Sequence, residues 1–480
     1  MKKLLLLLLL IGAIGAFLYL PRSSVFVAAG NAATLAVLNT AVDGSRAGAA
    51  FAPALDGEVY STGDQIRANA DGRAVLTFFD GSTLSVDPGS QVKVVALNRL
   101  PSDGMQVTVE QTLGRSWSAV TKLKTPDSRY EVKTPSASAA VRGTAFLTFV
   151  QQLPTGNTQT TYRVDEGTLE VTAAAGGTVT VSAGAQVTIA EGAKAPATPS
   201  PIPATSRLEI TASAGVGFLA LAPTGQSCGP MTGKAEIFGC VAAANKITVR
   251  DPAAGRWGLV VTSAAPLAGA TLTVEAFVGA ARNATRTLSR ALNASELVRT
   301  GITLTAGPPL ALSVFDDPVL ATSMCAATAP GRVVGGGAPD ARLELARSFA
   351  RENKSLPVSL VFTEGELNQA GPTGIGGEQG LKISGQKVTI DAGGVHGAAT
   401  AAMPFLTVNA SADVIGGPVG GKFSLRLSRL SAESLPPGLV DVVRWLAAAG
   451  TGGLGDSIPF QVRQVSFRSG CFFVSGLTPP

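Results

Sequence analysis

Histidine and cysteine are scarce in this sequence, and their scarcity limits the chemistry that the chain can perform. The 480 residues include one histidine, His396, and four cysteines without a C-x-x-C pair. A histidine-based metal site or a Ser-His-Asp triad would depend on that single imidazole. His396 lies in a Gly- and Ala-rich stretch between predicted strands, where an exposed turn is the expected setting. We therefore expect no metal site, no cofactor and no enzyme activity.

Charged residues are also few, at 15% of the chain, and the formal net charge is only +5. The sequence has no run of Lys and Arg interleaved with aromatic residues, the pattern that follows a phosphate backbone. Nucleic acid is therefore not an expected partner. Hydrophobic residues make up 45% of the chain and glycine is abundant, which is typical of a folded, β-rich protein. A chain of this length is too long for one core, so we expect several domains.

The N-terminus has the pattern of an export signal. Two lysines precede an apolar run from Leu4 to Leu20, which Pro21 closes. As a helix this run would rise about 25 Å, which is at the low end of what spans a bilayer and longer than the apolar core of a usual cleaved signal. Its length favours a retained membrane anchor over residues 1–23, with the remaining chain outside the cytoplasm. Cleavage after Ala29 would instead release a secreted protein.

The cysteines of an exported chain meet an oxidising environment and are expected to form disulfides. Four cysteines allow three connectivities. Cys228 with Cys240 would close a short, hairpin-like loop, which leaves Cys325 with Cys471, and this is the pairing that we expect. Four reduced, buried thiols are the alternative.

Residues 30–190 consist of short alternating runs separated by turn pairs, which predicts an all-β domain. The motifs in this stretch are G-D-Q-I-R with Asp64, the triplet Asp80-Gly81-Ser82, a T-P pair, V-R-G-T with Arg142, Gly143 and Thr144, then V-D-E-G and S-A-G. In order and spacing these motifs resemble the FecR domain. The resemblance implies a β-rich extracytoplasmic domain of the kind that receives a partner in envelope signalling.

The chain also departs from the family pattern at its N-terminus. Signalling members of that family carry a cytoplasmic domain for a sigma factor, whereas three residues precede the apolar run here. We therefore do not expect signalling by this chain alone.

Composition marks the next domain boundaries. Residues 191–206 hold four prolines without apolar periodicity, which predicts an extended, semi-rigid linker. Strand patterning resumes over 207–314, where a Pro-Gly turn before Trp257 is typical of a β-sandwich edge. A Pro- and Gly-rich connector is expected at 315–340.

Helical spacing enters with the last segment, 341–480. Apolar residues recur at helical intervals over 341–353 and 439–449, and Thr363 with Glu366 has the pattern of a capping box. Strand-like runs lie between these helices, which indicates an α+β domain.

This last domain resembles the bacterial lipid-binding domains related to the TULIP fold. The resemblance rests on V-F-T-E-G-E-L-N from Val361, L-P-P-G-L-V from Leu435, and V-R-Q-V-S-F-R-S-G from Val462. It implies a bent sheet around a helix that can leave an apolar groove for acyl chains. Lipid is therefore a candidate ligand.

Three patterns that can signal catalysis have simpler structural explanations. The G-x-S-x-G at 225–229 stands in a β context beside a cysteine, which favours a hairpin turn over a nucleophile elbow. The G-x-G-x-x-G at 450–455 follows a predicted helix and not a strand, which favours a helix-end loop. The paired carboxylates Asp316-Asp317 and Glu364/Glu366 fit turn and capping roles.

These observations predict a mainly β, multi-domain protein with an N-terminal membrane helix, a FecR-like domain, a β-sandwich and a C-terminal α+β domain. The expected function is non-enzymatic binding or sensing outside the cytoplasm, at the cell envelope. The expected partners are an envelope protein or glycan, with lipid as a further candidate. The alternative is a structural, adhesin-like spacer that binds no small molecule.

Overall fold

The computed structural model describes residues 32–480 except 40, 103, 124, 142, 204, 306–309, 336–338, 371–381, 404–405, 420 and 433–457. The apolar run Leu4–Leu20 lies outside these residues, and no helix within them is long and apolar enough to cross a membrane. The chain divides into two compact units, one formed by Gly30–Ala329 and one that contains Pro330–Pro480. The described residues are mainly β-strand, as predicted.

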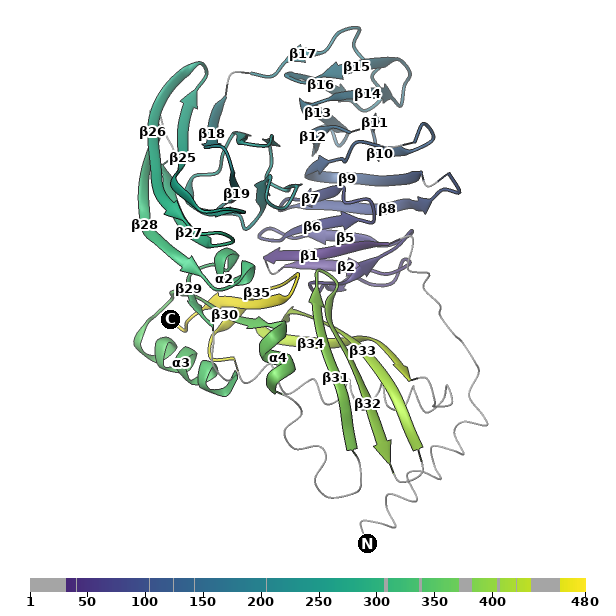
Figure 1. Cartoon of the computed structure of the whole chain (residues 1–480). Helices are drawn as coiled ribbons and strands as arrows, with labels where there is room; N and C mark the ends of the chain where they lie inside the picture. Colours follow the sequence, from purple (N-terminus) through teal and green to yellow (C-terminus); the bar gives the residue numbers. More distant parts are fainter. Residues whose placement is uncertain are drawn as a thin grey trace, which may run out of the picture. The chain divides into compact units, whose positions relative to one another are not determined.

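The first part of unit Gly30–Ala329 is an all-β domain (Figure 1). Its strands are β1 (Ala33–Asn39), β2 (Val42–Ser45), β3 (Ala52–Pro53), β4 (Val59–Tyr60), β5 (Gln65–Ala68), β6 (Arg73–Phe78), β7 (Thr83–Val86), β8 (Ser90–Arg99), β9 (Met105–Ala119), β10 (Arg129–Lys133), β11 (Ala137–Val141), β12 (Ala145–Gln152), β13 (Thr158–Glu166), β14 (Thr168–Ala173), β15 (Thr178–Ser182), β16 (Ala185–Ala190) and β17 (Ser200–Pro201).

These strands form two sheets that share the long strand β9. Sheet A runs β4-β1-β6-β7-β9-β12-β13-β16-β17. Sheet B runs β3-β2-β5-β8-β9-β10-β11-β14-β15. The N-terminal half of β9 pairs in sheet B and its C-terminal half in sheet A, so one strand joins the two faces of the domain.

The core of this domain lies between sheets A and B. Its strands alternate buried and exposed residues, as in β14 and β15, because successive side chains of a strand point to opposite faces. Tyr130 and Tyr162 are fully buried there, and their hydroxyls contact Ser118 Oγ at 3.2 Å and the Ala137 carbonyl at 3.1 Å. Burial raises the pKa of both tyrosines, so both hydroxyls remain protonated.

The predicted linker 191–206 is attached to this domain at several points. The Ala195 N–H donates to the Gly176 carbonyl at 3.1 Å, and the Ile202 N–H donates to the Gly184 carbonyl at 2.9 Å. Ser200 and Pro201 form β17, which pairs with Gln186 and Ala185 at the edge of sheet A. A proline is tolerated in this place because an edge strand does not need every N–H for pairing.

Two further sheets complete the unit as a β-sandwich. Their strands are β18 (Ser206–Ala212), β19 (Val216–Leu221), β20 (Ser227–Gly229), β21 (Lys234–Ala235), β22 (Cys240–Ala242), β23 (Lys246–Arg250), β24 (Gly255–Ser263), β25 (Leu267–Val278), β26 (Ala281–Leu292), β27 (Leu297–Thr305) and β28 (Ala311–Ala321). The sheet orders are β22-β23-β18-β25-β26 and β21-β20-β19-β24-β27-β28. Trp257 is fully buried, and its indole donates to the Ala253 carbonyl at 2.9 Å.

The sandwich extends beyond the boundary expected at residue 314. Strand β28 continues to Ala321, because it stays paired with β27 as far as Leu297. The short helix α2 (Met324–Thr328) follows, with Ser323 as its N-cap. Part of the expected connector 315–340 therefore belongs to the sandwich.

The unit that contains Pro330–Pro480 has helices and strands, as predicted. Its elements are β29 (Arg332–Val334), α3 (Pro339–Glu352), β30 (Pro357–Thr363), α4 (Glu364–Ala370), β31 (Lys382–Asp391), β32 (Gly394–Met403), β33 (Leu406–Val419), β34 (Lys422–Ala432), β35 (Gln461–Arg468) and β36 (Cys471–Leu477). They form the sheets β29-β30-β36-β35 and β31-β32-β33-β34. The predicted helix 439–449 and the G-x-G-x-x-G at 450–455 lie outside the described residues.

The predicted capping box is present at the start of α4. The Thr363 N–H donates to Glu366 Oε2 at 2.8 Å, and the Glu366 N–H donates to Thr363 Oγ1 at 3.4 Å. The same Glu366 forms an ion pair with the fully buried Arg342 at 2.9 Å. This carboxylate therefore ties α4 to α3, a role that the capping pattern alone did not predict.

Candidate functional site

The D-G-S motif forms a turn that ties sheet A to the loop after β9. Asp80 Oδ2 accepts hydrogen bonds from Ser82 Oγ at 2.5 Å and Thr121 Oγ1 at 2.8 Å, while Ser82 Oγ accepts the Thr121 N–H at 3.0 Å. Gly81 has φ +88°, a conformation that favours glycine. The three motif residues therefore build a turn and use their polar atoms within it.

The turns formed by the other motifs lie one after another beside this turn and are joined to it and to each other by hydrogen bonds. The Val120 N–H donates to the Thr144 carbonyl at 3.0 Å, and Thr144 Oγ1 donates to the Thr168 carbonyl at 2.9 Å. Gly143 has φ +100°, and a Cβ there would lie 2.9 Å from the Lys122 Cα. We call residues 80–82, 121–122, 143–144, 167–168 and 183–184 the turn column; the Ala183 N–H extends it by donating to the Gly167 carbonyl at 3.0 Å. Arg142 lies outside the described residues.

Asp64 fixes a separate loop. Its carboxylate accepts the N–H groups of Ala47 at 2.9 Å and Ser61 at 2.8 Å, and it pairs with Arg46 at 3.0 Å. The Arg46 guanidinium lies 3.8 Å from the centroid of the Tyr60 ring. Asp64 is buried, so its role in this structure is to hold the chain near β4 and β5.

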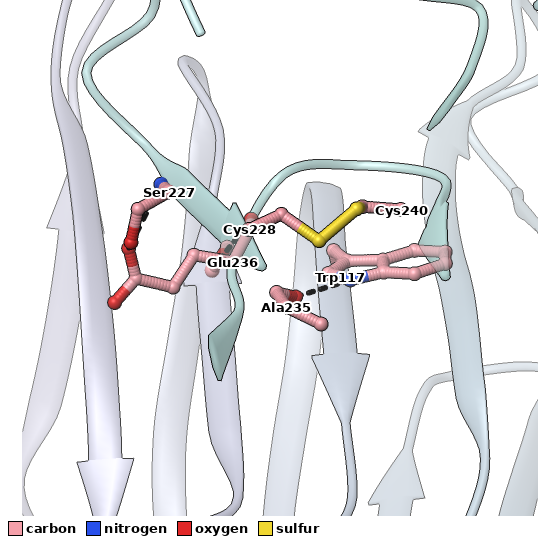
Figure 2. Close-up of a disulfide and its surroundings, with 7 residues drawn as sticks. Trp117, Ser227, Cys228, Ala235, Glu236 and Cys240 are labelled. Carbon is pink, nitrogen blue, oxygen red and sulfur yellow. Dashed lines mark hydrogen bonds between the residues drawn. A yellow bond between two sulfur atoms is a disulfide. The ribbon is translucent and has the colours of Figure 1, made fainter. Parts of the chain in front are cut away.

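Sheet A is covered on part of its outer face by a loop of the sandwich. We call residues 227–240 the clip loop; a disulfide joins Cys228 and Cys240 at its ends. The Trp117 indole donates to the Ala235 carbonyl at 2.8 Å, and Ser85 Oγ donates to the Glu236 carbonyl at 2.7 Å. Figure 2 shows the Trp117 ring beside the disulfide with its N–H directed to Ala235.

Charged groups complete the contact between sheet A and the sandwich. Asp165, whose side chain is 3% exposed, accepts Arg163 Nε at 3.0 Å and Arg250 Nε at 2.6 Å. Arg163 also pairs with Asp251 at 2.8 Å. Because these bonds connect β13 with the end of β23, the all-β domain and the sandwich form one unit despite the proline-rich segment between them.

The outer face of sheet B differs, because its side chains are polar and largely exposed. We call the outward residues of β10, β11, β14 and β15 the open face: Arg129, Glu131, Lys133, Ser138, Ala140, Thr168, Glu170, Thr172, Thr178, Thr180 and Ser182. They form cross-strand rows, such as Lys133, Ser138, Thr172 and Thr178. The Thr172 and Thr178 hydroxyls are 3.0 Å apart. Glu131 is buried between Arg129 and Lys133, at 3.3 and 4.0 Å.

The family comparison identifies the domain. Residues 64–193 match the model of the family described as FecR protein. The chain contains a FecR domain. This match confirms the resemblance carried by the D-G-S, V-R-G-T and S-A-G motifs, and the structure adds that β1–β4, which precede the match, belong to the same two sheets.

The similarity to proteins of known structure covers only part of the chain. The chain is similar to two crystal structures, at 1.65 and 2.50 Å, of a proposed anti-sigma factor from Parabacteroides distasonis ATCC 8503. For both, the identity is 18% and the TM-score is 0.23, and the similarity covers 27% of this chain and 56% of that one. The chain thus spans about half the length of these structures. No curated protein matches it.

The covered face of the FecR domain was not predicted from the sequence. Strand β7 is buried at every position, and Trp117 is fully buried although it points away from the domain's own core. An uninterrupted buried strand and an outward tryptophan are signals of a second covering layer. They could have indicated that another part of the chain packs on this sheet.

His396 does not lie in an exposed turn, contrary to the prediction. It belongs to β32 and is half-buried, with Nε2 2.8 Å from Asp391 Oδ1 and Nδ1 2.9 Å from Asp413 Oδ1. Desolvation lowers its pKa, but the hydrogen bonds and charges of Asp391 and Asp413 outweigh this, so the pKa is raised. The strand pairing placed three distant residues together, which the local Gly/Ala composition could not indicate.

The remaining candidate sites have structural roles where the structure describes them. Ser227 of the G-x-S-x-G motif begins β20 after a hairpin turn and bonds to Glu236 Oε2 at 2.7 Å. Glu364 accepts the Ile390 N–H at 3.1 Å. Asp316 and Asp317 lie within β28 and not in a turn, contrary to the prediction, because the chain stays paired with β27 there. Across the described ranges, no group of three or more His, Cys, Asp or Glu side chains could hold a metal ion.

The last two cysteines are also oxidised. Cys325 and Cys471 are both disulfide-bonded, and the described residues contain no free cysteine. The expected bond between these two residues stays a prediction, to be checked by mass spectrometry of unreduced peptides.

Proposed function

We propose that the chain is an extracytoplasmic FecR-domain protein that binds a protein of the cell envelope through the open face. The observation that carries this proposal is the asymmetry of the FecR domain. Sheet A is partly covered by the clip loop, whereas the open face of sheet B presents exposed hydroxyl and charged groups.

The oxidised cysteines support a location outside the cytoplasm. Disulfides persist in secreted and envelope compartments, where the cytosolic reducing systems are absent. The FecR match supports the same location. The membrane anchor over residues 1–23 remains a prediction that fits both observations.

The chemistry of the open face favours a polar protein surface as its partner. Threonine and serine hydroxyls can donate and accept hydrogen bonds, and the rows of β14 and β15 place them at regular spacing across the strands. Recognition would rest on binding alone, through hydrogen bonds and complementary shape at an interface of ordinary polarity. No bond in the partner needs to be made or broken.

Site-specific photocrosslinking tests this proposal. A photoreactive residue at Thr180, in the middle of the edge strand β15 of the open face, should crosslink to a defined envelope protein in cells that produce the full chain. The same residue at Thr155, which is also exposed, in the loop between β12 and β13, serves as the matched control. Thr172→Arg should abolish the Thr180 crosslink, because a long cation would interrupt the hydroxyl row.

Three outcomes would contradict the proposal. Equal crosslinking from Thr180 and Thr155 would show that proteins do not bind the open face in preference to the rest of the surface. A complete lack of protein crosslinks would favour the alternative of a structural spacer. Co-sedimentation of the purified chain with insoluble envelope glycan, lost in T172R, would show that the partner of this face is a glycan.

A further inference from the structure

His396, the only histidine of the sequence, joins three neighbouring strands of the sheet β31-β32-β33-β34. It lies on β32, with Nε2 2.8 Å from Asp391 Oδ1 at the end of β31. Its Nδ1 is 2.9 Å from Asp413 Oδ1 on β33, and His396 and Asp413 are directly opposite each other in the strand register. One imidazole therefore bridges the strands on either side of its own.

The opposite face of the same strands packs in the apolar core of this unit. Ile390 is buried there and lies opposite Val395, which packs against the same cluster. The Ile390 N–H donates to Glu364 Oε2 of α4 at 3.1 Å, and the Ile390 carbonyl accepts the Gly470 N–H at 2.9 Å. These contacts hold β31 on the core side, whereas on the outer face the imidazole of His396 contacts the last residue of the strand.

The two contacts of the ring determine its protonation state. An ionised carboxylate only accepts hydrogen bonds, and a neutral imidazole has one N–H and one bare nitrogen. Donation to Asp391 and Asp413 at the same time therefore requires a proton on both ring nitrogens. In the neutral ring, one nitrogen lone pair would face a carboxylate oxygen at 2.8 or 2.9 Å, which is repulsive. Desolvation lowers the pKa of His396, but the two carboxylates raise it by more, which favours the imidazolium.

The other charged groups on this face are cations that keep their charge when histidine titrates. Lys387 is exposed on β31, opposite Ala398, and Arg429 is exposed on β34, opposite Asp413. Lysine and arginine lose their protons only at much higher pH. A cation opposite Asp413 also favours the ionised carboxylate. The group of this cluster that changes its charge near neutral pH is therefore the imidazole.

The two carboxylates differ in how firmly they are held. The Asp391 side chain is 65% exposed and stands at the end of its strand, whereas the Asp413 side chain is 30% exposed and lies within β33. Asp391 Oδ1 also accepts the N–H of Gly393 in the turn that leads to β32, at 2.7 Å. Loss of one ring proton should therefore release Asp391 to water and loosen this turn, while Asp413 keeps the remaining N–H.

We propose that His396 is a pH-sensitive latch, which joins the β31–β32 turn to β33 when it is protonated and releases Asp391 and the turn when it is neutral. Histidine suits this role because its charge changes within the physiological range. The latch lies in the unit that contains Pro330–Pro480 and not in the FecR domain, so it does not depend on the proposed function.

Amide hydrogen exchange of the full chain tests the latch at about pH 5.5 and about pH 9, on either side of the ordinary histidine pKa of about 6.5. Each exchange rate is divided by the intrinsic rate at the same pH, so that only structural protection is compared. In the wild type, protection of amides 391–396 should fall by about fivefold at the higher pH, a modest factor because both ion pairs are partly exposed. Protection of β14 and β15 in the FecR domain should stay constant.

Two variants separate the latch from a general effect of pH. H396N should show low protection of the turn at both pH values, because one short amide cannot bridge two carboxylates. D391N should keep the turn protected at both, because its amide can accept from the imidazolium or donate to the neutral ring. Nitrogen NMR of the imidazole, unambiguous with a single histidine, should show two protonated ring nitrogens at the lower pH and one at the higher.

Three results would overturn the proposal. Unchanged protection of the wild-type turn while the ring loses its proton would show that the bridge does not hold the turn. An equal fall in D391N would show that pH acts through other groups. A neutral ring at the lower pH would show that one of the carboxylates carries the shared proton.

Discussion

Removal of the Cys228–Cys240 disulfide tests whether the clip loop depends on its covalent closure. Both cysteines are fully buried, so the suitable change is C228A/C240A; serine would leave hydroxyl groups buried without partners. The disulfide closes a loop with a sequence separation of 12. Loop-closure entropy for that length corresponds to about 2.8 kcal/mol at 25 °C.

Loss of the sulfur atoms from a packed core adds to this entropic effect. Cys228 and Cys240 belong to the core cluster of the sandwich, together with Trp257. We therefore expect the free energy of unfolding of unit Gly30–Ala329 to fall by about 3 kcal/mol or more. The clip loop should also loosen from sheet A, because the bond fixes both ends of the segment that holds Ala235 and Glu236.

Urea unfolding followed by tryptophan fluorescence measures the first effect, and the native emission spectrum reports the second. Trp117 should emit at longer wavelength in C228A/C240A, because its indole would gain contact with water. Reductant should lower the unfolding midpoint of the wild type more than that of the variant, which lacks this bond. A loss below about 1 kcal/mol with an unchanged spectrum would refute the reasoning, since the loop would then hold its place without the bond.

Three further predictions concern single residues. Gly143→Ala should lower the free energy of unfolding of the FecR domain by about 3 kcal/mol, because the new Cβ meets the Lys122 backbone. The control Gly156→Ala, where φ is also positive at +89° but the space is open, should lower it by only about 1 kcal/mol. Equal decreases in urea unfolding would argue against the close contact between the turns. Protonated His396 should stabilise its sheet fully at pH values below the ordinary histidine pKa of about 6.5, and this contribution should be lost as the pH rises through the raised pKa of the folded state. The melting temperatures of wild type and His396→Asn should therefore converge at high pH. A difference that does not change with pH would contradict the ion pairs. Thr363→Ala should destabilise helix α4 by about 1 kcal/mol, because it removes the N-cap hydrogen bond, and amide exchange in α4 should become faster. Unchanged exchange would show that the cap does not stabilise the helix.

Local patterns predicted those elements whose structure is decided by neighbouring residues. The alternation in β14 and β15 predicted strands with one buried face, and the D-G pairs predicted turns, as at Gly81. The Thr363 and Glu366 spacing predicted a capping box for the same reason, since cap geometry depends on residues three positions apart. Boundaries were predicted less well, because β28 is extended by pairing with β27 and not by its own composition.

The order of the motif residues of the FecR domain could be read from the sequence, whereas their arrangement in space could not. Their order was sufficient to identify the family. That Asp80, Ser82, Thr144 and Gly167 belong to one column of stacked turns depends on the pairing of strands far apart in the chain. Long-range pairing of this kind is set by the whole sheet and leaves no local signal in any one motif.

By itself the sequence determined the β-rich class, the FecR domain and the scarcity of groups for histidine or thiol chemistry, because composition, turn residues and alternation act over short distances. The tertiary structure decided which surfaces remain available. It placed the clip loop over Trp117, left the open face exposed and joined His396 to two carboxylates. Each of these depends on contacts between segments distant in sequence, whose partners only the folded chain brings together.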